Sequence, residues 1–307
     1  MDTSEYKTII YEEIGPITKI VHNEPEKRNA LTGQFILEFG DALHKFERNP
    51  EARAAVIFST GSCFCSGHNI QFVSKMEDWK SESKPSSSEQ KSAPTTEQDW
   101  RNQMDFMRDK FYYPLWDCKK PLVVGVQGGA YTGGAFFAGA CDIVVASEEA
   151  FFDWGVQHVT GTGGDVMLAY FGGWRKAMEM ALTGWNIDAM EAWRIGLVSK
   201  VVPADKLEKE VMRYAKIIAA MRPENVKLSK QHLKQMMNRL GVREGIFLEY
   251  ETNIMGHLAR SEWENEFYQV MRKDGMKAAV DFAHKPFEDQ GYSRYGPFGR
   301  REGKTKK

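Results

Sequence analysis

Cysteine is scarce in this sequence, and its placement argues against a zinc site and against disulfide bonds. The 307-residue chain contains four cysteines, Cys63, Cys65, Cys118 and Cys141. They form no Cys-x-x-Cys pair, and no set of histidines lies near them that would complete a tetrahedral zinc site. We therefore predict no metal site and four reduced, partly buried thiols, which are typical of cytoplasmic proteins.

Long apolar runs and an excess of one charge are also missing. No apolar run reaches the ~18 residues of a membrane helix, and residues 1–11 are polar where a signal peptide would be apolar. The 41 lysines and arginines nearly balance the 42 aspartates and glutamates, so no net field attracts nucleic acid or an anionic membrane. We expect a cytoplasmic protein that acts on a small molecule, without nucleic acid and without membrane insertion.

The order of the expected elements indicates an α/β fold. Alternating β-branched residues on both sides of Gly15 predict a hairpin over residues 6–21. Apolar positions at helical spacing after Thr32, a candidate N-cap, predict a helix. Residues 54–58 and 121–127 read as short buried strands, and a glycine turn and an apolar helix follow the second of them. These units predict a coiled stack of strands with helices outside.

Composition divides the chain into three regions. We predict a core over residues 1–205, an almost wholly helical region over residues 206–290, and a basic, flexible tail over residues 291–307. Within the core, residues 76–98 are rich in Ser, Glu, Lys, Pro and Thr, which predicts a mobile loop. This loop either covers a substrate or has no function.

Two glycine-rich turns are the segments of the sequence that indicate a binding or catalytic site. One, GGAYTGG over residues 128–134, joins a buried strand to an apolar helix, and the other, over residues 63–70, follows the strand over residues 54–58. Glycine lets backbone N–H groups approach a ligand, and the first N–H groups of a helix lack internal partners. If the turns lie side by side, the N–H groups of His68 and Gly133 converge on one carbonyl oxygen as an oxyanion hole.

At these turns the sequence resembles the crotonase superfamily, also called the enoyl-CoA hydratase/isomerase superfamily. The resemblance covers roughly residues 8–287, and its landmarks follow one another in the family's order. They are PEKRNAL at 25–31, FCSGHNI at 64–70, KP at 120–121, QG at 127–128, GG at 133–134, ACD at 140–142, LTG at 182–184, AWRIGLV at 192–198, VVP at 201–203 and DGMK at 274–277.

The resemblance implies a spiral core of ββα units, a C-terminal helical region that packs between subunits, and a homotrimer or a hexamer of two trimers. It also implies a coenzyme A thioester as the substrate and no tightly bound cofactor. Basic side chains such as Lys27 or Arg28 would lie near the phosphates of coenzyme A. The alternative for these two residues is a solvated surface pair. The residues implied in coenzyme A binding are Lys27, Arg28, Ala30, Ser66, His68 and Ile70.

The sequence departs from the family at the groups that move protons. The family's hydratases use two glutamates and its isomerases usually one, but Phe136 and Val156 stand at these positions, and neither side chain can carry a proton. The aspartate nucleophile of the family's dehalogenases also has no secure counterpart, because the segment around residues 160–164 is shortened. The chain is therefore expected to be an atypical member.

Asp153 and His158 are the titratable groups left near the expected site. Asp153 lies three positions before Val156, at a strand end that could aim it inward; a hydrogen-bonded structural carboxylate is the alternative. His158 shares a face with Val156 if the strand continues, and an imidazole titrates near neutrality; a structural histidine is the alternative. With His68 and Gly133, these two residues are our candidate catalytic groups.

Two further groups of residues favour a structural interpretation. The first has the spacing of a solvated helix face, although the family's architecture could bring it to a pocket wall: Glu249, Tyr250, Glu251 and His257. The second could line a broad pocket but more often forms the core: Phe136, Phe137, Phe151, Phe152 and Trp154.

Three functions remain open. The first is an acyl-CoA enzyme that stabilises an enolate or oxyanion while it hydrates or isomerises an unsaturated acyl-CoA, including bulky or cyclic acyl groups. The missing glutamates favour a second, the hydrolysis or retro-Claisen cleavage of a β-oxo acyl-CoA. The third is a non-catalytic acyl-CoA-binding or assembly protein, and the intact turns at His68 and Gly133 argue against it.

Overall fold

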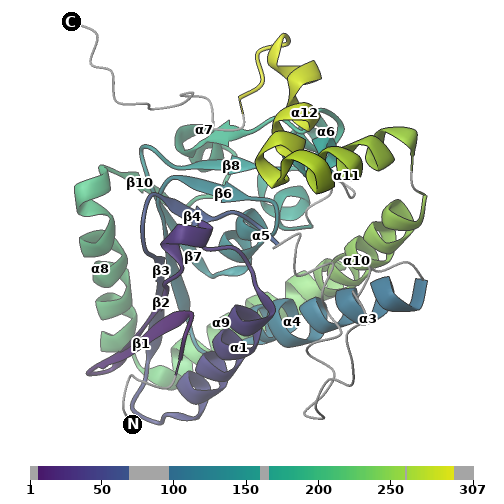
Figure 1. The fold of residues 1–307 in the computed structure, drawn as a ribbon. Helices are drawn as coiled ribbons and strands as arrows, with labels where there is room; N and C mark the ends of the chain where they lie inside the picture. Colours follow the sequence, from purple (N-terminus) through teal and green to yellow (C-terminus); the bar gives the residue numbers. More distant parts are fainter. Residues whose placement is uncertain (1–5, 69–96, 160–165, 260, 294–307) are drawn as a thin grey trace, which may run out of the picture.

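Two layers of β-sheet form the centre of the protein. The computed structural model describes residues 6–68, 97–159, 166–259 and 261–293 (Figure 1). The larger sheet has six strands in the order β1 (Ile9–Ile14), β2 (Ile17–His22), β3 (Ala54–Ser59), β5 (Leu122–Val126), β7 (Ile143–Ser147) and β10 (Lys200–Val202). The smaller sheet has four strands in the order β4 (Cys63–Cys65), β6 (Gly129–Tyr131), β8 (Phe151–Asp153) and β9 (Ile187–Asp188).

The chain coils from one sheet to the other. Each of β3, β5 and β7 in the larger sheet is followed by β4, β6 or β8 in the smaller sheet, and neighbouring strands of these two sets pair in parallel. Parallel strands need crossover connections, which here pass through helices such as α5 (Gly133–Ala140). This is the spiral of ββα units that the resemblance implied.

The N-terminal segment follows the local signals of the sequence. β1 and β2 form the expected antiparallel hairpin, with Ile14 opposite Ile17 and Gly15 in the left-handed region. Thr32 caps α1 (Gly33–Arg48), because its side-chain oxygen accepts a hydrogen bond from the Phe35 N–H at 3.1 Å.

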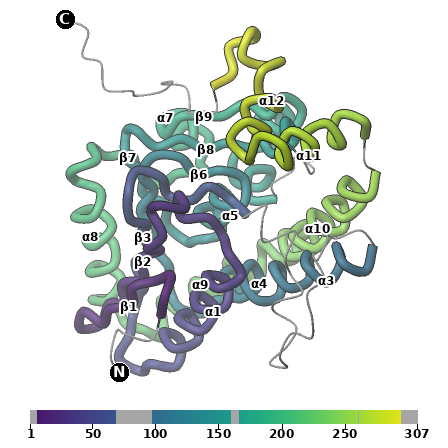
Figure 2. The backbone as a smooth tube through the Cα atoms, in the orientation of Figure 1, coloured from purple at the N-terminus to yellow at the C-terminus, as the bar shows by residue number. Residues whose placement is uncertain are grey.

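Helices enclose the sheets and continue to the C-terminal side. Before the glycine turn lie α3 (Glu97–Met107), a π-helical turn (Arg108–Tyr112) and α4 (Tyr113–Asp117); after it lie α6 (Trp174–Thr183), α7 (Ala189–Arg194) and α8 (Leu207–Ala220), which packs against the larger sheet. The last four are α9 (Pro223–Arg239), α10 (Val242–Leu258), α11 (Glu262–Asp274) and α12 (Met276–Glu288). Figure 2 shows α11 and α12 side by side above the smaller sheet.

Some expectations fall on residues that are not described. Most of the loop expected over residues 76–98 and most of the tail over residues 291–307 lie outside the described residues. Residues 97 and 98, which we assigned to the loop, instead begin α3. None of the described helices is long and apolar enough to cross a membrane.

An aromatic cluster around Phe137 joins the helices to the sheets. Every residue of α5 is buried, and the Phe137 ring lies 5.0–6.1 Å from the rings of Phe35, Phe39, Phe64 and Phe111, measured between centroids. These residues come from α1, β4 and the π-helical turn. One side chain therefore holds together three segments that are far apart in the sequence.

We predict that Phe137→Ala lowers the free energy of unfolding by about 3–5 kcal/mol, because it leaves a cavity among four rings. Urea denaturation measures the loss. Phe137→Leu retains part of the volume, so it should cost less. A loss below about 1 kcal/mol for the alanine variant would contradict this role of the ring.

Candidate functional site

Three strand ends of the smaller sheet meet at one place. β4 pairs in parallel with β6, with Cys65 opposite Ala130, and β6 pairs in parallel with β8, with Tyr131 opposite Asp153. Parallel strands present their carboxyl ends at the same edge, so the residues that follow them emerge together. The turn at His68, the turn at Gly133 and the side chain of Asp153 are brought together in this way.

Glycines keep the two turns in contact. Gly67 has φ +83°, and a Cβ there would lie 2.4 Å from Thr132 Oγ1 and 3.0 Å from the Tyr131 carbonyl oxygen. A Cβ on Gly133 would lie 2.9 Å from Cε1 of His68. The expectation that the two turns lie side by side is therefore correct.

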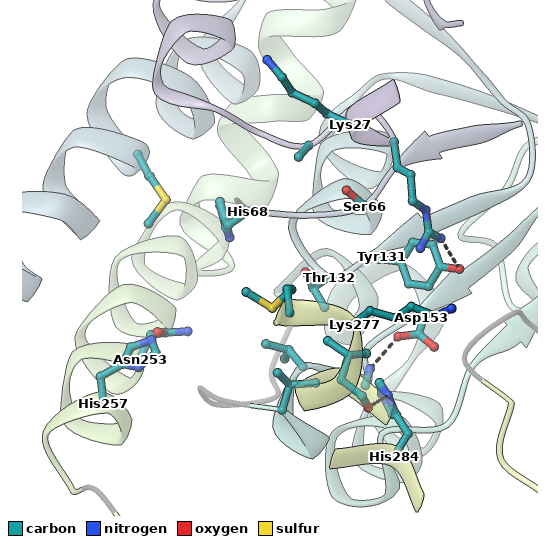
Figure 3. A pocket seen from close by; sticks show the side chains of 18 of the residues that line it. Lys27, Ser66, His68, Tyr131, Thr132, Asp153, Asn253, His257, Lys277 and His284 are labelled. Atoms are coloured by element: carbon teal, nitrogen blue, oxygen red, sulfur yellow. Dashed lines mark hydrogen bonds between the residues drawn. The ribbon is translucent and has the colours of Figure 1, made fainter. Parts of the chain in front are cut away.

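A cavity of about 840 Å³ opens beside these turns (Figure 3). It is lined by the N-terminal loop, by both turns, by Asp153 and by residues of α3, α10, α11 and α12. The structure brings to this cavity six of the residues that we named from the sequence: Lys27, Arg28, Ala30, Ser66, His68 and Asp153. Ile70 lies outside the described residues. Gly133 is buried and follows Thr132, which lines the cavity.

Asp153 is a buried carboxyl group with three hydrogen-bond donors. Its side chain is 3% exposed. Oδ1 accepts the Gly155 N–H at 2.8 Å, and Oδ2 accepts Nδ2 of Asn186 at 3.3 Å and the hydroxyl of Tyr292 at 3.1 Å. Burial raises the pKa of Asp153 to about 6, although these donors and the charge of Arg28 oppose the rise. The group therefore titrates near physiological pH.

His158 does not share the face of Val156, so that expectation was wrong. Residues 155–158 form a 3₁₀ turn instead of continuing β8, and Val156 lines the cavity whereas His158 is not one of its lining residues. His158 Nε2 lies 2.7 Å from the Thr183 carbonyl oxygen, and its ring stacks on Phe287 at 3.8 Å between centroids. Burial lowers the pKa of His158, so the ring is a neutral packing element.

His68 is partly buried, and its ring is neutral. Its Nε2 is hydrogen-bonded to the hydroxyl of Tyr112 at 2.9 Å, and the same hydroxyl lies 3.5 Å from the Gly133 carbonyl oxygen. Burial, and to a lesser extent the nearby His257, lowers the pKa of His68 to about 4. Tyr112 therefore links the two turns. No motif in the sequence around Tyr112 indicated this role.

The basic residues of the N-terminal loop are held in place by polar contacts. Arg28 is in the left-handed region at φ 54°, and its Nη2 donates to the Tyr131 hydroxyl at 2.9 Å while the guanidinium lies over that ring. Lys27 is 55% exposed and donates to buried Glu24 at 2.5 Å. Asn29 supports the loop, because its Nδ2 donates to the carbonyl oxygens of Thr60 and Cys63.

Phe136 and Val156, which the resemblance aligned with the family's two glutamates, lie in different surroundings. Phe136 is buried in α5, where its ring is 4.3 Å from that of Tyr112 between centroids. Val156 lines the cavity close to Asp153. The other aromatic residues that we expected in the core, Phe137, Phe151, Phe152 and Trp154, are also buried, and they are not lining residues of this cavity.

The C-terminal helices form a wall of the cavity, which was the alternative that we did not favour for α10. We favoured a solvated face for α10, but Tyr250 and His257 are buried and line the cavity, so that interpretation was wrong for these residues. Glu251 points elsewhere and pairs with Arg101. The signal was present: Tyr250 and His257 are seven residues apart, which places them on one face of a helix.

The thiols and the acidic groups do not form a metal site in the described part of the chain. All four cysteines are free and buried. Within the described residues, no group of three or more histidine, cysteine, aspartate or glutamate side chains is placed to hold a metal ion.

Comparison with known proteins decides the family. The family model described as enoyl-CoA hydratase/isomerase matches residues 12–254. The chain belongs to this family. It is 30% identical over 282 residues to the mitochondrial enoyl-CoA hydratase of Pongo abelii, with 87% of this chain and 82% of that protein covered. It is also 30% identical over 237 residues to the short-chain-enoyl-CoA hydratase of Clostridium acetobutylicum, with 76% and 83% covered.

A solved structure of the enoyl-CoA hydratase/isomerase family shares the fold. The crystal structure of an enoyl-CoA hydratase/isomerase from Xanthobacter autotrophicus Py2 superposes with a TM-score of 0.81 at 27% identity, covering 92% of this chain and 99% of that one. The crotonase-like α/β fold that the resemblance implied is thereby confirmed.

We predict that Gly67→Ala lowers both stability and any turnover, because the new Cβ would force the turns at Gly67 and Thr132 apart. Gly15→Ala is the matched control. Gly15 also has positive φ, but a Cβ there meets nothing within 4 Å. The control should lose about 1–2 kcal/mol of stability, the cost of a left-handed alanine, and keep its activity. Equal behaviour of the two variants in thermal unfolding and turnover assays would contradict the close contact.

Proposed function

We propose that this enzyme binds an acyl-CoA thioester, stabilises the enolate or oxyanion of its carbonyl group with the backbone N–H groups of His68 and Gly133, and transfers protons through Asp153. One observation carries the proposal. The ends of β4, β6 and β8 deliver both turns and the Asp153 carboxyl to the same cavity.

Two backbone donors support the oxyanion part of the proposal. Gly133 is the first residue of α5, and the first N–H groups of a helix have no partner within it. His68 follows Gly67, which packs directly against the turn at Thr132. Donors fixed in advance by the fold stabilise developing negative charge by a few kcal/mol each. Burial lowers the pKa of the His68 ring, so the ring adds no positive charge to the site, and we assign the stabilisation to the backbone.

Asp153 is our candidate for proton transfer, because Phe136 and Val156 cannot act in this way. A carboxyl group with a pKa of about 6 exchanges protons readily near neutral pH. The ionised form would take a proton from water or from the substrate, and the protonated form would return it. We propose the hydration or isomerisation of an unsaturated acyl-CoA as the reaction, including acyl groups that are bulky or cyclic.

The N-terminal loop is the proposed site for coenzyme A. Lys27, Arg28, Ala30, Ser66 and His68 line one continuous cavity that leads to Asp153. The exposed Lys27 ammonium and the Arg28 guanidinium supply positive charge for phosphates. In this proposal the thioester is a substrate and no cofactor is held tightly.

A different reaction of an acyl-CoA is the second candidate. Since Val156 and Phe136 leave Asp153 without a second carboxylate at the family's positions, hydrolysis or retro-Claisen cleavage of a β-oxo acyl-CoA also fits one base beside an oxyanion hole. A non-catalytic acyl-CoA-binding or assembly role is the third candidate, and the close fit of the two glycine turns counts against it.

We predict that Asp153→Asn lowers turnover by roughly 10²- to 10⁴-fold while acyl-CoA binding persists. If the ionised carboxylate is the base, wild-type turnover rises with pH through about 6 and then levels, because burial raises the pKa of Asp153 to that value. The measurements are kcat against pH and the Kd for a thioester. Asp41→Asn, which removes an exposed carboxylate bonded to Tyr6, is the control.

A panel of thioesters separates the candidate reactions. The α,β-enoyl-CoA reports hydration, the β,γ-enoyl-CoA reports isomerisation, and the β-oxo acyl-CoA reports cleavage. Full turnover by Asp153→Asn on the active thioester would refute the role of this carboxyl. Tight binding of all three thioesters without turnover would favour the non-catalytic candidate.

We also propose that the chain assembles as a homotrimer or as a hexamer of two trimers. Large apolar side chains are exposed along the outer helices, which is typical of an interface. They include Leu228, Leu233 and Met236 on α9, Leu240 directly after it, and Leu248 and Met255 on α10.

Light scattering should give three or six times the 35.0 kDa mass of the chain. Leu233→Asp, which places a charge on the exposed apolar face of α9, should lower that mass. A monomer at micromolar concentration would contradict the proposal.

A further inference from the structure

The end of the described chain holds the Asp153 carboxyl. The Tyr292 hydroxyl donates to Oδ2 at 3.1 Å. Nδ2 of Asn186 donates to the same oxygen at 3.3 Å and also to the Ser293 carbonyl oxygen at 2.7 Å, so it connects the carboxyl to the C-terminal segment. Residues far away in the sequence therefore fix one oxygen of Asp153, while the local Gly155 N–H fixes the other.

Tyr292 is built into this position. After α12 the chain turns back, and the Tyr292 N–H donates to the Phe287 carbonyl oxygen at 3.1 Å. The side chain is 4% exposed and packs against the rings of His158, Trp185 and His284. Gly155 leaves space for the hydroxyl, because a Cβ there would lie 2.6 Å from it.

His284 offers a second acceptor to the same hydroxyl. Its Nδ1 lies 2.9 Å from the Val280 carbonyl oxygen, which only accepts, so Nδ1 carries the proton. In the neutral form of the ring Nε2 is then an acceptor, and it lies 3.4 Å from the Tyr292 hydroxyl. Among the described residues, the one hydroxyl proton of Tyr292 thus has two acceptors within reach, Oδ2 of Asp153 and Nε2 of His284. The side chains of Tyr292, His284 and Asp153 all line the cavity.

We propose, resting on the proposed function of Asp153, that Tyr292 and His284 are positioning residues whose hydrogen bonds follow the protonation of Asp153. When Asp153 is ionised, the Tyr292 hydroxyl donates to Oδ2. When Asp153 has taken a proton, the hydroxyl turns to Nε2 of His284. The Tyr292 proton stays on its own oxygen throughout, and the proton that Asp153 gains comes from substrate or water and returns there.

The groups around Asp153 determine how this hydrogen bond affects the pKa of Asp153. Arg28 faces the carboxyl from the N-terminal loop, and Tyr131, which is hydrogen-bonded to Arg28, faces it from β6. Tyr292 faces it from the C-terminal segment and His284 from α12, and Lys277 lines the same cavity. Burial opposes ionisation, whereas Arg28 and the Tyr292 hydroxyl favour it. Removing the hydroxyl should therefore raise the pKa of Asp153, and removing its alternative acceptor should lower it.

Infrared difference spectroscopy across a pH titration of the full chain tests the proposal without any substrate. The carbonyl band of protonated Asp153 is identified as the band that Asp153→Asn removes. In Tyr292→Phe its midpoint should rise by roughly half to one pH unit, the equivalent of one hydrogen bond. In His284→Phe the midpoint should fall, and His284→Gln, which restores an acceptor, should return it toward the wild-type value.

Kinetics give a second readout. The rising limb of the kcat–pH profile should move with the infrared midpoint in each variant, while KM for the thioester stays unchanged. Tyr6→Phe is the matched control, because it removes an exposed tyrosine–aspartate hydrogen bond to Asp41 and should move neither readout. If Tyr292→Phe does not fold, 3-fluorotyrosine at position 292 preserves the packing and strengthens the donor, so the midpoint should fall.

The outcomes separate this inference from the proposed function. An unchanged midpoint in Tyr292→Phe, with Asp153→Asn inactive, overturns the inference alone. Full activity of Asp153→Asn overturns the proposed function and, with it, the positioning role of Tyr292 and His284 in catalysis. A midpoint that rises in both Tyr292→Phe and His284→Phe overturns the part assigned to His284.

Discussion

The parallel pairing of three very short strands is the constraint on which the site depends. β4, β6 and β8 have three residues each, yet their register places the ends Cys65, Tyr131 and Asp153 next to one another. Such short strands form few hydrogen bonds, so their register also depends on two other features. These are the contact between the two glycine turns and the packing of the buried aromatic residues of α5. The chemistry of the site is therefore an outcome of how one small sheet is packed.

Local signals in the sequence predicted the local structure well. The hairpin around Gly15, the cap at Thr32 and the two glycine turns follow from the conformational preferences of single residues, and the structure contains all of them. The motifs along the chain identified the family. His158 was misplaced, because a strand of period two was extended past Asp153, where the chain instead tightens into a 3₁₀ turn.

The sequence indicated the cavity wall formed by α10–α12 only weakly, through the seven-residue spacing of Tyr250 and His257 on α10. An apolar stripe on a helix shows that the helix is covered, but it does not show by what. Tyr292 is the clearest case, since its role depends on a turn that brings it to a strand end 139 residues earlier in the sequence. Contacts of this kind are set by tertiary packing and leave no periodic signal.

Ionisation of the buried Asp153 carboxyl serves the proposed catalysis but lowers the stability of the folded protein. Its pKa in the folded protein, about 6, lies above the ordinary value of 3.8, so the folded state holds the proton more tightly than the unfolded chain does. The stability that this provides is fully present below pH 3.8 and is lost as pH rises through 6, to the extent of about 2–3 kcal/mol. At the pH where Asp153 is ionised and ready to act as a base, the fold therefore carries a buried negative charge that other contacts must offset.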